Sequence, residues 1–186
     1  MSARPPAPHP LPLHVRTIRV EALESEPGPD GAGLRLHGVL EDRRPRGVPA
    51  ALRHAGDVIH HMEVTLTVAW PSLVVSGIEG TMRTVPYAGV CPDALPPLQS
   101  LVGVAVSRGF TRAVNERIGR ERGCTHVAAL IQAMGPVVRQ AAGAAFGFVA
   151  AGGGGPAPWF INSCQAWREG GPLHRTLLAG EAPAAD

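Results

Sequence analysis

The segment IHHMEVTLTVAW, Ile59 to Trp70, and the segment SLVVSGIEGTM, Ser72 to Met82, decide the fold class. In both segments apolar residues alternate with polar ones, and Pro71 separates the two runs. Successive side chains of a strand point to opposite faces, so this period indicates two half-buried strands. Two such runs joined by a short proline-bearing connection favour a hairpin, and we predict that residues 59–69 pair with residues 72–81.

A second hairpin is predicted upstream. The run HVRTIRVE from His14 and the run LRLHGVLED from Leu34 also alternate, and the turn-rich EPGPDGAG lies between them. The stretch from Asp42 to Asp57 is rich in arginine and proline and is interpreted as a loop.

Helices are predicted in the second half of the chain. The runs SRGFTRAVNERIG (107–119) and CTHVAALIQAMGPVVRQ (124–140) have helical spacing of apolar residues, and Pro136 should kink or divide the second helix. The apolar run at 141–151 is about half the length of a membrane span and is interpreted as a core helix. A final strand is predicted within WFINSCQAW, 159–167.

Strands followed by helices indicate an α+β fold, with an antiparallel sheet of two hairpins and helices packed on one face. A chain of 186 residues that is 45% hydrophobic suits one domain, predicted over residues 14–186. The proline-rich residues 1–13 are predicted to be disordered, and they lack the apolar core of a secretory signal. We therefore expect a cytoplasmic protein.

Composition argues against several classes of partner. The net charge of +2 and the 4% aromatic content do not favour a nucleic-acid surface, and we expect neither nucleic acid nor membrane as a partner. Three widely separated cysteines are an odd number, so reduced thiols are expected. No motif encodes the oligomeric state, and a homodimer is one option.

Two histidines follow one another on the stronger predicted hairpin. His60 shares a face with apolar residues and should point into the core, whereas His61 should lie on the opposite face. A buried histidine is most often held by a hydrogen bond without a functional role, so His60 alone would not indicate a site.

Cys124 and His126 lie in the first turn of a predicted helix. The free N–H groups and the positive dipole end at that position favour a thiolate, which suits a metal ligand or a nucleophile. The plainer interpretation is that Cys124 is a small buried hydrophobic residue. Cys91 lies in the turn PYAGVCP, from which side chains often project toward a site, although it could equally be a buried loop thiol.

Two further side chains are candidates for substrate contacts. Tyr87 could donate a hydrogen bond to a ligand, but tyrosines usually line the edge of a core. Arg112 could pair with an acidic group of a ligand, but an arginine on a solvated helix face is more common. Cys164 is too remote in sequence to place.

Five motifs, taken in order, resemble an uncharacterised bacterial family, the domain of unknown function DUF2889; they are GDVIHHM, PYAGVCP, LVGVAVSRGF, GCTHVAALI and NSCQAW. The resemblance covers nearly the whole chain after Leu13. In that family the first motif usually reads Ile-His-Asp-Met and the third usually ends in Gly-Trp, so His61 and Phe110 depart from the pattern. All three cysteines, with His60 and His126, fall on family positions.

The order of strands, turn cysteine and helix-opening cysteine also looks like the scaffold proteins of iron–sulfur cluster assembly. By that likeness His60, Cys91 and Cys124 would stand where the scaffold cysteines stand, with His126 as the neighbouring histidine. A set of two histidines and two cysteines suits zinc better than a cluster. Losing a thiolate and the adjacent aspartate argues against cluster assembly.

These observations predict a small metal-binding protein, with zinc held by His60, Cys91, Cys124 and His126. Such an ion would support a lyase or hydrolase acting on a small organic or aromatic substrate, with Cys124, His126 and His61 as catalytic residues. Iron or an iron–sulfur cluster is the less favoured metal. The alternatives are a metal or cluster carrier without catalysis, a metal-free enzyme using Cys124 and a histidine, and an interaction module without a site.

Overall fold

The structure, a computed structural model, describes residues 11–28, 31–46, 57–146 and 160–180. The chain divides into two compact units, Met1–Ala142 and Gly143–Asp186. The expectation of one domain over 14–186 stays a prediction. The predicted disorder of residues 1–13 falls mostly on residues 1–10, which lie outside the described part of the chain, while Leu11 and Leu13 are exposed.

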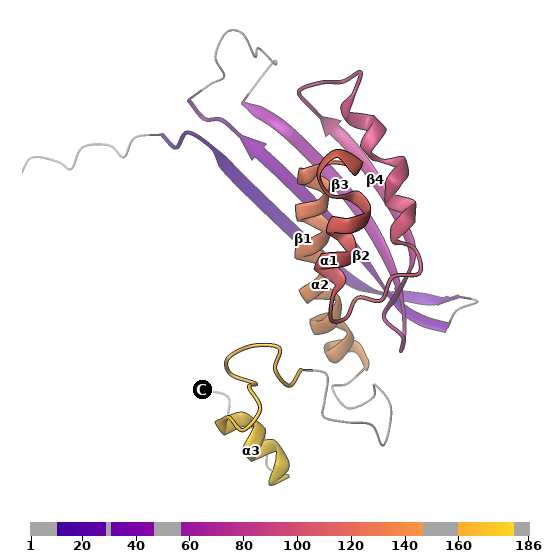
Figure 1. The fold of residues 1–186 in the computed structure, drawn as a ribbon, viewed down its shortest axis with the longest axis vertical. Coiled ribbons are helices and arrows are strands. Elements are labelled where there is room, and N and C mark those ends of the chain that lie inside the picture. Colours follow the sequence, from indigo (N-terminus) through magenta and orange to yellow (C-terminus); the bar gives the residue numbers. More distant parts are fainter. Residues whose placement is uncertain (1–10, 29–30, 47–56, 147–159, 181–186) are drawn as a thin grey trace, which may run out of the picture. The chain divides into compact units, whose positions relative to one another are not determined.

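The first unit is built on a four-stranded antiparallel sheet (Figure 1). Its strands are β1 (Val15–Gly28), β2 (Gly31–Arg43), β3 (Val58–Ala69) and β4 (Val74–Thr84), and they lie in sequence order. Both predicted hairpins are confirmed, because β1 pairs with β2 and β3 pairs with β4. Residues 42 and 43, predicted to open a loop, instead end β2, since both pair with β3.

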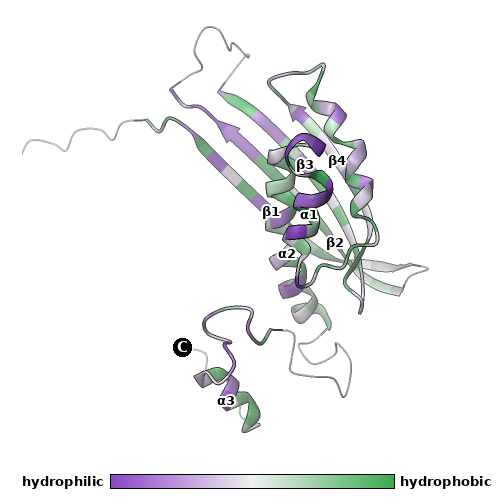
Figure 2. Cartoon of the chain, in the orientation of Figure 1, coloured by the Kyte–Doolittle hydropathy of each residue, from purple (hydrophilic) through white to green (hydrophobic). Residues whose placement is uncertain are grey.

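Alternation gives the sheet an apolar inner face and a polar outer face. Buried residues at even positions occupy the inner face, among them Leu36, Leu40, Met62 and Leu66. The outer face carries charged, histidine and threonine side chains, as in the cross-strand pair His37 and Thr65. Figure 2 shows the alternation of hydrophobic and hydrophilic residues along the strands.

Helical segments follow the sheet and include η2 (Cys91–Ala94), η3 (Pro96–Leu101), α1 (Phe110–Ile118), η4 (Arg120–Arg122) and α2 (Thr125–Phe146). Two glycines mark where they meet the inner face. A Cβ atom at Gly38 would lie 3.0 Å from Leu130 of α2, and one at Gly80 would lie 2.7 Å from Leu98 of η3. The fold is therefore α+β, with helices packed on one face of the sheet.

The predicted apolar stripe of α2 is buried; it consists of Val127, Leu130, Ile131, Met134 and Val138. Pro136, which we expected to kink or divide this helix, lies inside one continuous α2. The residue is on the exposed side of α2, and the helix is not divided.

Residues 160–167 of the second unit form turns and bends. The final strand predicted within 159–167 is therefore wrong. Asn162 has a φ of 61°, its N–H donates to the Trp167 carbonyl at 2.9 Å, and the Phe160 ring packs edge-on against Trp167. The segment therefore folds back on itself before α3 (Pro172–Leu178). Residues 147–159, which include part of the predicted core helix, lie outside the described residues.

None of the helices described is long and apolar enough to cross a membrane.

Candidate metal centre

A buried carboxylate lies near the end of β2. Asp42 continues the inner-face alternation of Leu36 and Leu40, and its side chain is 0% exposed. Among the described residues it is the one charged or polar residue in the buried class. An ionised group in such a position must be paired to offset its lost hydration.

Arg16 provides the main partner from the neighbouring strand. The two residues are directly opposite across β1 and β2, and Arg16 Nε and Nη2 each donate to Asp42 at 2.7 Å. His14 Nε2 lies 3.0 Å from the Asp42 Oδ1 atom. Burial raises the pKa of Asp42, but the hydrogen bonds from Arg16 and His14 and the charge of Arg16 outweigh it, so the pKa lies far below its usual range. Asp42 is ionised at neutral pH.

Two histidines meet the other side of this carboxylate. His60, opposite Asp42 on β3, has its Nδ1 atom 3.0 Å from Asp42 Oδ2, and His126, in the first turn of α2, has its Nε2 atom 3.5 Å from the same oxygen. The two imidazole rings lie against each other with centroids 3.7 Å apart and planes tilted by 31°. One ligand atom from each of the three residues lies within 4.8 Å of the others, so the three could hold a metal ion.

The protonation states suit such an ion. Burial lowers the pKa of His60, and the hydrogen bond to Asp42 opposes this only in part. Burial, with the nearby charge of His60, also lowers the pKa of His126. Neutral imidazole and ionised carboxylate are the forms that bind metal ions.

Cys124 adjoins this group at the start of α2. Its Sγ atom lies 3.5 Å from His126 Nδ1, on the opposite side of the ring from the nitrogen that faces Asp42. Cys124 also contributes to the raised pKa of Arg16, after the hydrogen bond and charge of Asp42. Cys124, His126 and Asp42 therefore form a line of thiol, imidazole and carboxylate.

The profile of a protein family described as "Protein of unknown function (DUF2889)" matches residues 14–140. The chain belongs to the DUF2889 family. The matched range begins at His14 and contains Asp42, its partners and Cys124, so this group lies wholly within the DUF2889 region. No curated protein and no solved structure matches the chain, and the likeness to iron–sulfur scaffolds stays a prediction.

The four residues predicted to bind metal are brought together only in part in this DUF2889 protein. His60 and His126 are in the group and Cys124 touches it through His126, but in the described chain the residues close enough to share an ion do not include Cys91 or Cys124. Cys91 lies in η2, after β4, and is partly exposed. Asp42 is the third member of the group, because the register between β2 and β3 places it opposite His60.

Sequence reasoning missed Asp42, Arg16 and His14. A signal for Asp42 was present, since it extends the alternation of LRLHGVLED and therefore shares the face of Leu40. A buried aspartate on an apolar face needs a charged or hydrogen-bonding partner. Arg16 lies on the matching face of the preceding strand.

His61 lies on the outer face, as alternation predicted. Its two ring nitrogens are 3.4 Å from a Glu41 oxygen and 3.2 Å from a Glu63 oxygen. Arg83 also binds Glu63, and its hydrogen bond lowers the pKa of that carboxyl group. The sheet thus separates His61 from the group around Asp42.

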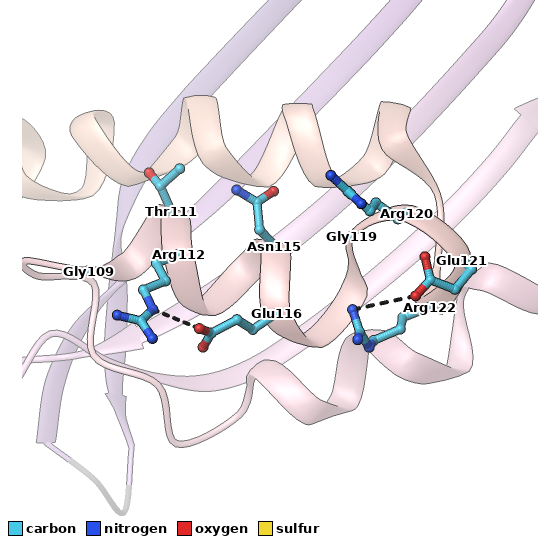
Figure 3. Close-up of a pocket in the computed structure, with 9 residues that line it drawn as sticks. All are labelled: Gly109, Thr111, Arg112, Asn115, Glu116, Gly119, Arg120, Glu121 and Arg122. Atoms are coloured by element: carbon cyan, nitrogen blue, oxygen red, sulfur yellow. Dashed lines mark hydrogen bonds and ion pairs between the residues drawn. The ribbon is translucent and has the colours of Figure 1, made fainter.

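The two predicted substrate contacts have other surroundings. Tyr87 is exposed in the connection after β4. Arg112 is 83% exposed and pairs with Glu116 one turn along α1 at 2.7 Å. It lines an open pocket over α1 and η4, which includes Asn115 and Arg120 but none of the residues around Asp42 (Figure 3). Cys164 is exposed in the second unit.

Proposed function

We propose that Asp42, His60 and His126 bind a divalent metal ion, and that zinc is the favoured ion. The observation that carries the proposal is the placement of one carboxylate and two imidazoles within 4.8 Å, with all three held in metal-binding protonation states by burial and by Arg16. Two nitrogens and one oxygen are ligands that zinc accepts, and three protein ligands leave a coordination position for substrate or water.

The chemistry of such a centre is Lewis-acid catalysis in a lyase or hydrolase reaction. With the ion bound, the positive charges of the ion and of Arg16 would exceed the single negative charge of Asp42. This excess favours a small organic acid, aromatic acids included, as the substrate. Arg16 would hold Asp42 in place through its two hydrogen bonds, as partners behind metal ligands commonly do.

The test is zinc titration of protein prepared without chelator or affinity metal, followed by calorimetry and elemental analysis. The wild type should take up zinc in near-stoichiometric amount, whereas His60→Ala and His126→Ala should each weaken binding at least about tenfold. His61→Ala is the matched control, because it removes the neighbouring imidazole on the outer face. Equal zinc binding by all four proteins would overturn the proposal.

A carrier function is a variant of the same proposal. The donors favour a resident ion over an iron–sulfur cluster, because clusters need thiolates and the group around Asp42 contains none. Transfer of bound zinc to a competing acceptor separates the two: a carrier releases it rapidly, and a metalloenzyme retains it.

A second candidate is metal-free catalysis by Cys124, favoured by the line from its Sγ atom through His126 to Asp42. His126 would accept the thiol proton while Asp42 orients the ring. The readout is alkylation of Cys124 by iodoacetamide with chelator present, in which the carbon–sulfur bond forms and iodide leaves. His126→Ala should slow this reaction, and an unchanged rate would remove the candidate.

The cytoplasmic location stays a prediction.

A further inference from the structure

One long edge of the sheet has no partner strand in the described chain. β1 has 14 residues and pairs with β2 on one side only, as its place at the border of the sheet in Figure 1 shows. The N–H and C=O groups on its other side lie at an open edge, and such an edge is a template for another strand unless charge, proline or a covering segment blocks it. Its pairing with β2 is regular from Val15 to Ser25, so this part is suited to receive a strand.

Apolar side chains are exposed along the same strand. Ile18, on the inner-face side opposite Leu40, is 38% exposed, and Leu23, on the outer-face side, is 69% exposed. A strand placed beside β1 would cover part of both, because neighbouring strands lie about 4.8 Å apart.

The charges of β1 identify which strand fits. Arg19 and Glu21 flank Val20, point to the outer face and bind each other at 2.5 Å. If two copies of β1 pair antiparallel about Val20, Arg19 of each copy lies opposite Glu21 of the other. Cross-strand pairs of opposite charge stabilise a sheet, and directly opposed like charges destabilise it.

The two adjacent registers that keep the same faces together are worse. Pairing about residue 19 would place the two Arg19 side chains opposite each other, and pairing about residue 21 would do the same with Glu21. In the register about Val20, Ile18 lies opposite Ala22 of the second copy, so the apolar ladder of the inner face continues across the junction. Of these three registers, the one about Val20 is therefore the one that opposes Arg19 to Glu21 and places no like charges opposite each other.

We propose that two copies of this chain pair through β1, antiparallel and centred on Val20, and form one sheet of eight strands, four from each copy. The interface is isologous, since the same residues contribute from each side. Arg19 and Glu21 of both copies form a closed set of alternating charges on the outer face. In this register Arg16, which binds Asp42, lies opposite Glu24 of the second copy on the inner face. Arg19 and Glu21 bind each other on the outer face, so changes at these two residues test the dimer without removing a residue of the metal centre.

Sedimentation analysis across concentration tests this with charge reversals. The wild type should dimerise, and Arg19→Glu and Glu21→Arg should each raise the dimer dissociation constant about tenfold or more, since two symmetric pairs turn repulsive. The two variants mixed should form a heterodimer, because every opposed pair is then of opposite charge, and the double variant should dimerise like the wild type. Glu79→Arg, on the outer face of β4, is the control and should leave the dimer unchanged.

Two outcomes would overturn the proposal. One is a wild-type chain that stays monomeric at its highest soluble concentration, which would leave the β1 edge to a strand of another protein. The other is a dimer that persists in both Arg19→Glu and Glu21→Arg. Failure of a mixture of these two variants to form a heterodimer would count against the proposal in the same way. Circular dichroism of each variant separates lost dimerisation from lost folding.

Discussion

Asp42 and Arg16 lie directly opposite on β2 and β1 and are joined by two hydrogen bonds of 2.7 Å, with the carboxylate fully buried. This pair holds an ionised oxygen beside His60 and His126. Two of the three proposed ligands, Asp42 and His60, therefore lie on strands of the sheet and His126 lies in α2, so the geometry of the ligands depends on the stability of the fold.

Removing the arginine should destabilise the fold. Arg16→Gln leaves a buried carboxylate without its main donors, and we expect the free energy of unfolding to fall by about 1–3 kcal/mol. Urea unfolding measures this. Arg35→Gln, at an exposed position on the outer face of β2, should change the value by less than about 0.5 kcal/mol. Equal effects at the two positions would mean that the Asp42 pair contributes nothing specific.

The same pair predicts a dependence on pH. The folded pKa of Asp42 is lowered, so in acid the unfolded chain binds a proton that the folded chain does not. The stabilisation by Asp42 is therefore complete well above the unfolded pKa of about 3.9 and is lost as the pH falls below it. Unfolding of wild type and Asp42→Asn across pH should show a stability difference that shrinks below about pH 4. A constant difference would contradict an ionised Asp42.

Cobalt can report whether Cys124 is a ligand. Because Cys124 lies outside the group around Asp42, the cobalt-loaded protein should lack the near-ultraviolet absorption of a thiolate bound to cobalt, and Cys124→Ser should leave the spectrum unchanged. A thiolate band that disappears in Cys124→Ser would instead restore this cysteine to the ligand set predicted from the sequence.

Metal binding should weaken in acid. Both histidines must be neutral to bind an ion, and burial lowers the pKa of each. Zinc affinity should therefore persist to somewhat below the usual histidine pKa of about 6.5 and fall as the imidazoles protonate. Calorimetry at several pH values checks this, and affinity that does not change down to about pH 4 would argue against histidine ligands.

The packing of η3 on the sheet can be tested with two glycines of β4, Gly80 and Gly77. A Cβ atom at Gly80 would lie 2.7 Å from Leu98 and 2.9 Å from Leu95, so Gly80→Ala should cost about 1–3 kcal/mol through forced repacking. Gly77 on the same strand faces Thr67 at 3.6 Å, an ordinary contact. Thermal unfolding should therefore show little loss, or a small gain, for Gly77→Ala. If the two variants lose equal stability, the close approach of η3 is not the reason why residue 80 must be glycine.

Much of the fold could be predicted from the sequence because its signals are local. The alternation in residues 59–69 and the helical spacing from Val127 to Val138 each specify a face, and burial of that face follows wherever the element packs. The strand predicted within 159–167 is wrong, because a turn at Asn162 closes the segment on itself.

The residues of the candidate site also divide into those that local sequence signals indicate and those that only the tertiary structure brings together. His60 and His126 were recognised because one interrupts an apolar face and the other begins a helix, and both features are visible along the chain. Cys91 was placed with them by resemblance and by its position after a strand, which do not set a distance. That Asp42 stands there instead depends on the register of β1, β2 and β3, because hydrogen bonds between strands align residues 16, 42 and 60 that are far apart in sequence. Local pattern thus determined which faces are buried, whereas strand register and the packing of α2 decided which polar groups share the interior.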